Sequence, residues 1–403
     1  MVDYDPFSDA ILDDPFPVYA RLRAESPVHY LERHDSWALA RFEDVWNASA
    51  DPERFVSPGP SLQTISTAAS LEAELADEEV AISSIFGMNP PQHTALRKRL
   101  VSNFGPGAVR RLEPRIAAIV DECLEQARAR GRCDVIGDLA GQVSVRVACM
   151  IIGLPLEDAS LLSGIVKRFF DREPGIEGLP PDALVASQEL SAYLLDQVRA
   201  RRRRGLGDSD ALDAYGSIEI DGSRFADEDL ASHLSILVVG GTETLPKVFA
   251  GGVLQLHRHP DQRAALVADP SLIPTAFTEI ARYEMPTQFL TRTVGRDLEL
   301  RGEKLREGQG VLLLYRSANR DEAEFDTPDR FDIHRAAPRI LSFGHGTHIC
   351  LGQHAARLEA KIMYEKLLAA VPDYTVLEDE VVRARSEFVA GYQEMPIVFE
   401  ARR

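Results

Sequence analysis

The chain has 403 residues, of which 45% are hydrophobic and 27% are charged, as is ordinary for a globular protein. Its 45 basic and 63 acidic side chains give a net charge of −18. That balance disfavours a general binder of nucleic acid or of anionic membranes, because phosphate surfaces attract lysine and arginine.

The four cysteines, at positions 123, 133, 149 and 350, form no Cys-x-x-Cys pair, so neither a disulfide framework nor a zinc ribbon is indicated. The N-terminal residues are acidic and lack the basic and then apolar order of a signal peptide. No apolar stretch approaches the roughly 18–20 residues of a membrane span. We therefore expect a cytoplasmic protein without a membrane anchor.

The first eighty residues predict a short helix, a hairpin and a long loop. Residues 17–25 have helical apolar spacing, and Pro27 ends that helix. Residues 28–31 and 37–40 flank a polar connection, as the strands of a hairpin do. Residues 57–81 are rich in small residues and proline, and we expect a functional loop there.

Helical patterns dominate the rest of the chain. Apolar residues recur every three or four positions over residues 92–104, 113–130, 138–152, 156–170, 183–204, 227–257, 274–283 and 355–371. Residues 217–225 predict a hairpin with Asp221-Gly222 at its turn, residues 289–300 alternate like a strand, and residues 171–181 are interpreted as a lid. Neither a repeat nor a linker divides the chain. The expected fold class is mostly α with small β-sheets, in a single domain over residues 1–403.

The ten residues from Phe343 to Gly352 are the most informative segment. Three glycines allow tight backbone bends, and Cys350 stands directly ahead of a predicted helix. The free N–H groups and dipole of a helix N-terminus lower the pKa of a thiol, and the resulting thiolate can bind a metal or attack a carbon. An isolated cysteine is more often simply buried. The pattern Phe-Gly-x-Gly-x-His-x-Cys-x-Gly, however, is similar to the haem-binding segment of the cytochrome P450 family.

The resemblance implies the P450 fold, with a long central helix over a haem b whose iron is bound by Cys350. Glu279 and Arg282 resemble the Glu-x-x-Arg pair that the family carries on a helix. The third member of that internal network is expected to be Arg330, with Asn319 and Arg320 as nearby candidates.

Residues 90–97 resemble the helix start whose side chains meet the haem propionates in the family. His93 and Arg97 are four residues apart and therefore share one helical face. Buried propionates need cationic or N–H partners, and the resemblance implies that His93, Arg97, Arg292 and His348 supply them. It also implies haem contacts from Gly240, Gly241, Phe343, Gly344 and Gly352.

Residues 240–244, Gly-Gly-Thr-Glu-Thr, resemble the oxygen-handling stretch of the family's central helix. Thr244 follows Gly240 by four residues, so its hydroxyl can hydrogen-bond the Gly240 carbonyl and spread the turn. The resemblance implies that Thr244 and Glu243 are the catalytic residues, with Glu243 connecting a proton relay to solvent.

The chain departs from the family pattern directly after Thr244, where it continues Leu245-Pro246-Lys247 instead of with another Thr or Ser. Proline has no N–H and clashes with the carbonyl four residues back, here that of Thr242. We therefore predict a sharp kink between residues 240 and 248.

The activity implied by the resemblance is insertion of one oxygen atom of O₂ into a small hydrophobic substrate. No flavin or iron–sulfur motif is present, so the expected electron donors are a separate ferredoxin and ferredoxin reductase. A local basic patch is expected to dock them: Lys98, Arg99, Arg110, Arg111 and Arg357. The resemblance also implies the residues that line the substrate pocket: Phe169, Phe170, Val239, Thr287, Gln288, Phe289, Leu290, Phe388 and Val389.

Three alternatives remain open at this point. A non-catalytic haem sensor would keep Cys350 but would not need Glu243 and Thr244 together. A peroxide-driven haem-thiolate peroxygenase is a second alternative, which the retention of both residues disfavours. A cysteine hydrolase would pair Cys350 with His345 or His348 and would not need the Glu-x-x-Arg pair.

Overall fold

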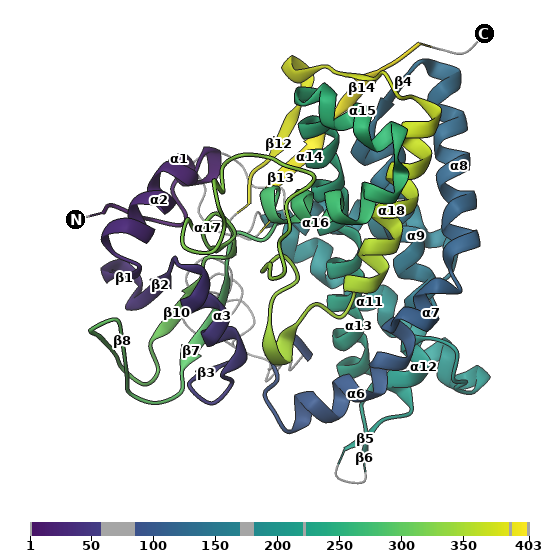
Figure 1. Ribbon diagram of the computed structural model, residues 1–403. Coiled ribbons are helices and arrows are strands. Elements are labelled where there is room, and N and C mark those ends of the chain that lie inside the picture. The colour runs from purple at the N-terminus through teal and green to yellow at the C-terminus, as the bar shows by residue number, and fades with distance from the viewer. Residues whose placement is uncertain (1, 58–84, 170–180, 221–222, 387–388, 401–403) are drawn as a thin grey trace.

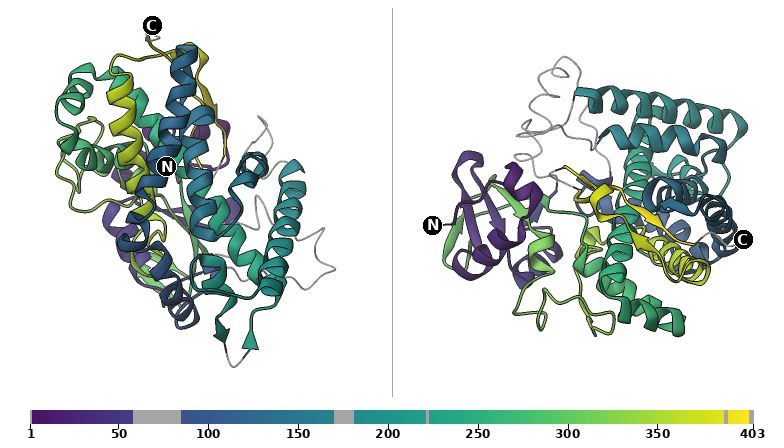
Figure 2. Two further views of the ribbon diagram at one scale, coloured as in Figure 1. Left: turned by 90° about the vertical axis from the view of Figure 1, so that its right-hand side faces the viewer. Right: turned by 90° about the horizontal axis from the view of Figure 1, so that it is seen from above.

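The computed structural model describes residues 2–57, 85–169, 181–220, 223–386 and 389–400. A five-stranded sheet with the N-terminal helices stands at one side, and a larger body of helices stands at the other (Figure 1). The view from above in Figure 2 shows the same two parts side by side. Many helices with small sheets confirm the expected fold class. The predictions for Phe170, Phe388, the 57–81 loop, the lid and the Asp221-Gly222 turn fall wholly or largely outside the described residues.

The five-stranded sheet joins strands from distant parts of the sequence. Its order is β1 (Val28–Leu31), β2 (Ser36–Leu39), β10 (Gly310–Leu313), β7 (Leu290–Val294) and β3 (Phe55–Val56). The antiparallel pairing of β1 with β2 confirms the predicted hairpin. β10 pairs with β2 in parallel and with β7 antiparallel. Every residue of β2 and β10 is buried, as expected for central strands covered on both faces.

The remaining sheets are small and antiparallel. Strands β5 (Glu219–Ile220) and β6 (Ser223–Arg224) confirm the hairpin predicted at residues 217–225. The strand predicted at residues 289–300 is divided into β7 and β8 (Leu298–Leu300), and β8 pairs with β9 (Glu303–Leu305). The other pairings join strands near the C-terminus with one another and with one earlier strand: β12 (Val382–Ala384) with β13 (Gly391–Glu394), and β14 (Pro396–Val398) with β11 (Thr375–Val376) and β4 (Arg132–Asp134).

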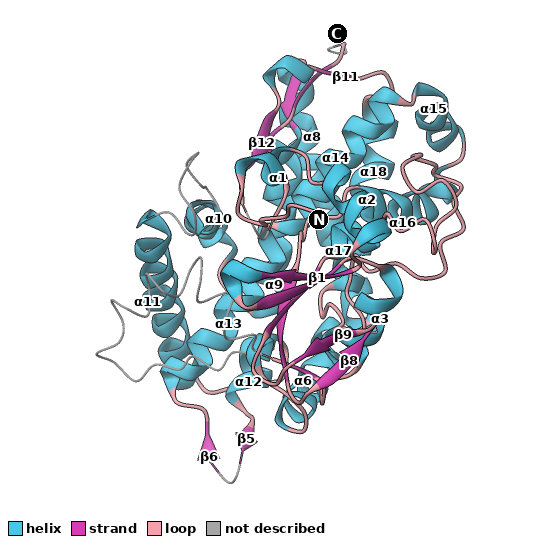
Figure 3. Cartoon of the chain, turned by 90° about the vertical axis from the view of Figure 1, so that its left-hand side faces the viewer, coloured by secondary structure: helices cyan, strands magenta, loops and turns pink. Residues whose placement is uncertain are grey.

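The N-terminal helices cover the sheet. They are α1 (Asp9–Asp13), α2 (Phe16–Glu25) and α3 (Phe42–Ala50). Helices α1 and α2 lie beside β1 in Figure 3, and Ile11, Tyr19 and Leu22 from them pack in one cluster with Leu31 and Leu312 of the sheet.

The helical body contains all but one of the remaining described α-helices. They are α6 (Gln92–Phe104), α7 (Pro106–Arg110), α8 (Glu113–Arg130), α9 (Gly141–Ile152), α10 (Ala159–Phe169), α11 (Pro181–Arg204), α12 (Ala211–Gly216), α13 (Asp227–Thr242), α14 (Thr244–Arg258), α15 (Pro260–Ala268), α16 (Ile273–Tyr283) and α18 (Gln353–Ala370). The short helix α17 (Tyr315–Ala318) lies on the sheet side, against α2 and α3. A π-helix, η4 (Val135–Ala140), leads into α9, and short 3-10 turns include η3 (Ile85–Gly87) and η7 (Gly346–His348). The helices predicted at residues 92–104 and 113–130 are confirmed as α6 and α8, whereas the long helix predicted at residues 227–257 is two helices.

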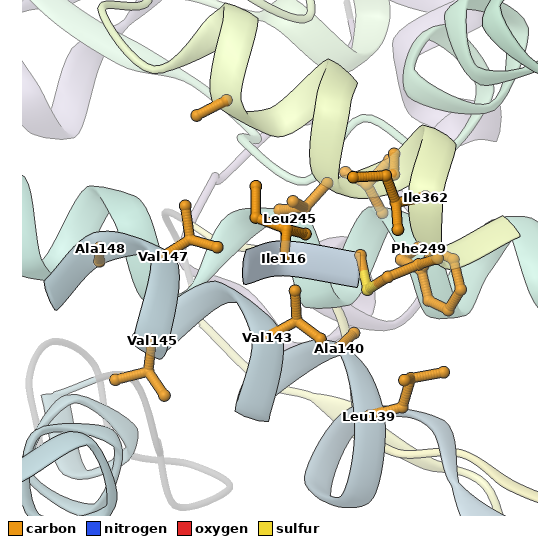
Figure 4. Packing of buried hydrophobic residues seen from close by; sticks show 14 of the residues in the cluster. Ile116, Leu139, Ala140, Val143, Val145, Val147, Ala148, Leu245, Phe249 and Ile362 are labelled. Atoms are coloured by element: carbon orange, nitrogen blue, oxygen red, sulfur yellow. The ribbon is translucent and has the colours of Figure 1, made fainter. Parts of the chain in front are cut away.

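The main core lies where α8, α9, α14 and α18 meet. Figure 4 shows Ile116 of α8, Val143 of α9, Phe249 of α14 and Ile362 of α18 pointing toward one another. Ile116, Val143 and Phe249 are fully buried. This packing fixes α14, which begins at the end of the segment 240–244, and α18, which follows the cysteine loop 343–352.

One stretch, Val135–Ile152, is long and apolar enough to cross a membrane, with a mean hydropathy of 1.6. The expectation that no such stretch exists was therefore wrong. The segment comprises η4 and α9, and 61% of it is buried inside the protein, as in the core helix of a globular fold.

Candidate active site

The loop that carries Cys350 is a closed turn ahead of α18. The Cys350 N–H donates to the Phe343 carbonyl at 2.7 Å, and Gly344 and Gly346 have φ values of +67° and +70°. A Cβ on Gly346 would lie 2.3 Å from the carbonyl oxygen of Ser49, at the end of α3. The loop therefore needs glycine at 346 both for its backbone conformation and for its contact with α3.

Two opposed effects act on the Cys350 thiol. The N–H groups of Gly352 and Gln353 and the charge of Arg97 lower its pKa, as the sequence predicted. Burial acts more strongly in the other direction and raises the pKa of the Cys350 thiol, although the residue keeps accessible surface. The predicted net lowering is therefore wrong for the protein alone. A bound metal cation reverses this balance, because a coordinating thiol is deprotonated outright.

The two histidines of the cysteine loop are engaged with other rings. The His345 ring stacks on Trp46 with ring centroids 3.5 Å apart, and the His348 ring stacks on His93 at 4.1 Å. Within the described residues, neither imidazole is hydrogen-bonded to Cys350. A cysteine hydrolase needs such a nucleophile–base pair, so this arrangement disfavours that alternative.

His93, Arg97, Arg292 and His348 come together, as the sequence predicted. Arg97 Nη2 donates to the Ile349 carbonyl, and Arg292 Nη1 donates to the Thr291 carbonyl at 2.7 Å. In the described part of the chain, His93 Nδ1 and His348 Nε2 are buried and have no hydrogen-bond partner. Burial, and after it the nearby arginine charges, lowers the pKa of His93 to about 4 and that of His348 to about 3.

This cluster fits the acidic edge of a haem. Buried nitrogen atoms without partners beside two arginines are costly by themselves, and an anionic group relieves both costs. Two propionate carboxylates supply that charge, and Cys350 follows His348 by only two residues. The donor set and the thiol therefore suit one iron porphyrin.

A buried ion-pair network lies behind the cysteine loop. Glu279 and Arg282 of α16 are fully buried and form two hydrogen bonds, Nε to Oε2 at 2.7 Å and Nη2 to Oε1 at 2.8 Å. Arg282 Nη1 donates to the Asn319 carbonyl at 2.8 Å, and Asn319 Oδ1 accepts from the Leu341 N–H at 2.9 Å. The network thus fixes the backbone two residues before Phe343.

The third member of the network is Arg335, so the prediction of Arg330 was wrong. Arg335 Nε donates to Glu279 Oε1 at 3.1 Å. The Arg330 side chain is 68% exposed and pairs with Asp332 at 2.6 Å. The turn after Asp332 carries Arg335 back toward α16, and sequence distance alone does not distinguish the two arginines.

The central helix is broken where the sequence predicted a kink. α13 ends at Thr242, α14 begins at Thr244, and Glu243 lies between them with φ −101° and ψ −43°. Pro246 therefore occupies the first turn of α14, where its missing N–H would have no partner in any case. The expected bond from Thr244 to the Gly240 carbonyl is not formed; Thr242 Oγ1 donates instead to the Val238 carbonyl at 2.8 Å.

The two glycines before the break differ in their surroundings. Both are exposed, and a Cβ on Gly240 would meet nothing within 4 Å. A Cβ on Gly241 would lie 3.1 Å from the Cβ of Ala148 on α9. Gly241 therefore permits close helix packing, whereas Gly240 leaves open space at the surface of the helix.

Lys247 is a site residue that the sequence analysis did not assign. Its Nζ lies 2.5 Å from Glu243 Oε1, and the two side chains are only 7% and 15% exposed. The signal that could have found it is the Glu–Lys spacing of four residues, which places both side chains on one helical face.

The residues expected to line the substrate pocket are only partly brought together. Thr287 forms an isolated bridge with Val389, and Gln288 Nε2 donates to the Ser386 carbonyl at 3.0 Å. Phe289 is buried in the N-terminal core cluster instead, so its assignment to the pocket was wrong. Phe289 directly precedes β7, and its ring packs with Leu312 and Leu314 on one side of the sheet. The remaining described candidates are partly buried: Phe169, Val239 and Leu290.

Four of the five predicted patch residues are exposed, namely Lys98, Arg99, Arg110 and Arg111. Arg357 is partly buried: its guanidinium lies 4.7 Å from the centre of the Phe343 ring, and its Nη1 donates to Thr278 Oγ1 at 3.2 Å. Arg357 therefore belongs to the packing of the cysteine loop and not to the free surface.

Comparison with known proteins gives a consistent result. A family model described as Cytochrome P450 matches residues 186–371. The chain is 34% identical over 404 residues to the putative cytochrome P450 123 of Mycobacterium tuberculosis (strain ATCC 25618 / H37Rv), covering 99% of this chain and 97% of that protein. It is also 34% identical over 406 residues to the vitamin D(3) 25-hydroxylase of Pseudonocardia autotrophica, with the same coverage. The structure of P450BioI in complex with an acyl carrier protein ligated to hexadec-9Z-enoic acid superposes with a TM-score of 0.85 at 29% identity, covering 97% of this chain and 100% of that chain.

A helical fold with a cysteine loop, a buried glutamate–arginine pair and a cationic cluster defines a haem-thiolate protein. The chain belongs to the cytochrome P450 family. It is therefore a monooxygenase whose cofactor is a cysteine-ligated haem b.

Proposed function

We propose that Cys350 binds the haem iron and that His93, Arg97, Arg292 and His348 hold the two propionates. The observation that carries this proposal is a pair of buried imidazole nitrogens without partners beside two arginines, one on His348 of the cysteine loop and the other on His93 of α6, which stacks on it. When bound, the haem supplies the activation of dioxygen, which amino-acid side chains do not perform. The whole chain is proposed to act as one domain around this group.

Thr244 and Glu243 are proposed to handle protons at the helix break. The Glu243 carboxylate is ion-paired and mostly buried, and Thr244 is its neighbour in the chain. The Thr244 hydroxyl can give a proton at Oγ1 and regain one from Glu243. The open space at Gly240 leaves room for a small molecule beside these two groups.

The substrate is proposed to be a small hydrophobic molecule. Phe169, Val239 and Leu290, which the resemblance assigns to the pocket, are partly buried apolar side chains, and Thr287 forms a bridge with Val389. The similarity to a vitamin D(3) 25-hydroxylase supports an apolar substrate. A screen of vitamin D3, a steroid and a long-chain fatty acid for shifts of the haem spin state tests this, and a preference for polar sugars instead would contradict it.

The electron donors are proposed to be a ferredoxin and its reductase in the cytoplasm. The exposed cations Lys98, Arg99, Arg110 and Arg111 on and after α6 and α7 support docking of an acidic protein. Turnover with ferredoxin, reductase and O₂ supports this route, whereas turnover with hydrogen peroxide alone would favour the peroxygenase alternative.

The Cys350→Ala variant tests the central assignment. The purified wild-type protein is expected to show the long-wavelength absorption band of reduced thiolate-ligated haem under carbon monoxide, and the variant is expected to lose it. The matched control is Cys149→Ala, which removes a buried thiol in α9 and should leave the band unchanged. Retention of the band by Cys350→Ala would overturn the proposal.

A further inference from the structure

A cavity of about 150 Å³ opens beside the break between α13 and α14. Its described lining comes from β4, η4, α9, α10, the helix break and the strands near the C-terminus. Gly137, Lys167 and Glu394 of this lining are exposed to solvent. Thr242 and Lys247, which also line the cavity, are each 7% exposed. The cavity is therefore open to solvent and also borders the Glu243–Lys247 ion pair.

The lining of this cavity is polar enough to hold water. Gln142, Ser163 and Gln393 add amide and hydroxyl groups to the charged residues of the lining. A polar cavity that offers each water two to four partners is hydrated, and one water needs only about 10–15 Å³ of such volume. The space therefore accommodates a chain of several water molecules.

Lys247 is held in one position by the strand that packs against α14. A Cβ on Gly391 of β13 would lie 2.8 Å from the Lys247 Cβ and 3.4 Å from its Cδ, so the lysine stem lies directly against the glycine backbone. Gly391 has a φ of +134°, which side chains rarely adopt. The ammonium group at the end of this stem pairs with Glu243.

A mostly buried ion pair of this kind is weak evidence for stability, because removing two charges from water offsets much of their attraction. Its place in the chain points to another role. Glu243 lies between a cavity open to solvent and Thr244, and it is the residue between the two helices. Pro246 cannot donate to the Thr242 carbonyl, so the regular helix is interrupted here, and the Glu243–Lys247 pair lies beside the cavity.

We propose that Lys247 is a positioning residue that holds Glu243 at the inner end of this cavity, and that water in the cavity carries protons from solvent to Glu243. The carboxylate takes a proton from the nearest water, passes it toward the Thr244 hydroxyl and returns to its ionised form. Overall, substrate, O₂, two electrons from the donor and two protons give the hydroxylated product and one water. This inference rests on the proposed roles of Thr244 and Glu243.

The first test separates the ion pair from the cavity. Lys247→Met removes the counter-charge, Lys247→Arg restores it, and Ser163→Leu fills the cavity from α10 without touching the pair. The matched control is Lys361→Met, the same substitution in the Lys361–Glu365 pair of α18, which has the same four-residue spacing and lies outside the cavity lining. All variants are measured as holoenzymes with ferredoxin, reductase and O₂ and no added substrate.

The measured quantity is the share of consumed O₂ that is released as hydrogen peroxide instead of being reduced to water, together with the solvent deuterium isotope effect. Lys247→Met and Ser163→Leu are expected to slow proton delivery by about tenfold, which is less than the loss of a complete general acid would cause. Both variants should therefore release a larger share of the consumed O₂ as hydrogen peroxide and show a larger solvent deuterium isotope effect. Lys247→Arg and Lys361→Met should resemble the wild type. Unchanged values in both Lys247→Met and Ser163→Leu would overturn the inference.

A second readout needs no turnover. A buried carboxylate without a counter-charge favours its protonated form. The infrared spectrum of Lys247→Met should therefore contain a protonated carboxyl band that vanishes in the Lys247→Met/Glu243→Gln double variant. Absence of that band would contradict the positioning role. The carbon monoxide band of each variant shows separately whether the thiolate-ligated haem is in place, so failure of the proposed function and failure of this inference are distinguishable.

Discussion

The side chain of Glu359 places a carboxyl group in the protein core. It lies on α18, is 4% exposed and accepts a hydrogen bond from Ser144 Oγ at 3.0 Å. Burial raises the pKa of Glu359 from 4.5 to about 8, against the smaller opposite effect of Ser144. The folded protein therefore keeps this proton under conditions in which the unfolded chain releases it.

We predict that the free energy of unfolding falls as the pH rises from about 4.5 to 8, with a contribution from Glu359 of about 1.4 kcal/mol per pH unit. Glu359→Gln removes this contribution, so the variant should be more stable than the wild type at pH 8 and close to it below pH 4.5. Urea unfolding across this pH range measures the effect. The control Glu365→Gln, on the same helix but partly exposed beside Lys361, should keep the wild-type slope.

The network around Glu279 gives a second prediction for single residues. Arg335 bonds Glu279 and also donates to the carbonyls of Thr327 and Arg330, at 3.1 and 2.9 Å. Arg335→Ala should lower the free energy of unfolding by about 3 kcal/mol, because it removes one of the two cationic partners of the fully buried Glu279 carboxylate. Arg330→Ala removes an exposed ion pair and should change it by less than about 0.5 kcal/mol. Equal effects in urea unfolding would contradict the assignment of Arg335.

Single-residue properties were the least predictable from the sequence. The donors His93, Arg97, Arg292 and His348 could be named because the family pattern fixes their spacing. The choice of Arg335 over Arg330 depends on the path of a turn, which carries no periodic signal. The raised pKa of the cysteine thiol depends on how much protein surrounds it, and local sequence predicts only the opposing effect of the helix N-terminus.

The cysteine loop and α3 form a contact between two elements that tolerates no side chain. Gly344 and Gly346 both have positive φ, but a Cβ on Gly344 would meet only the His348 carbonyl at 3.8 Å. A Cβ on Gly346 would come within 2.3 Å of the Ser49 carbonyl. A side chain at 344 would therefore cause backbone strain alone, whereas a side chain at 346 would cause the same strain and a steric clash with α3.

We predict that Gly344→Ala costs about 1–2 kcal/mol of stability through backbone strain alone, and that the protein keeps its haem. Gly346→Ala should cost more and lower the haem content, because α3 or the loop must move. Haem absorbance per protein and urea unfolding of both variants check this. A milder effect at 346 than at 344 would show that the loop does not depend on its contact with α3.

The helices were largely predictable because their apolar spacing is strong, as α6 and α8 illustrate. The break before Pro246 was also predictable, since proline cannot donate the bond that a continuous helix needs. The place of the break, at Glu243, was not predictable. The proline limits the break only to the preceding turn, where it leaves the Thr242 carbonyl without its usual donor.

The whole molecule carries a net charge of −18, yet exposed cations gather around α6 and α7. We predict that the double charge reversal Lys98→Glu/Arg99→Glu raises the KM for ferredoxin by about tenfold at low salt and weakens its salt dependence, with kcat little changed. The control Arg203→Glu/Arg204→Glu makes the same change of net charge on exposed residues of α11. An equal effect in both variants would show that overall charge, and not this patch, attracts the donor.

For the architecture of the whole molecule, the sequence indicated a mostly helical fold but not how the five-stranded sheet is assembled. Neither β10 nor its parallel pairing with β2 was predicted. A four-residue buried strand is too short for a periodic signal, and parallel pairing depends on a partner elsewhere in the chain.

The parallel pairing of β2 with β10 also bears on how the protein is made. β2 leaves the ribosome early, but the strand that covers its open edge is synthesised only after most of the helical body. Pairings between residues so distant along the chain form slowly and leave strand edges uncovered in the meantime. The nascent N-terminal hairpin must therefore wait for its neighbour, and this interval is where a chaperone would protect the growing polypeptide from aggregation.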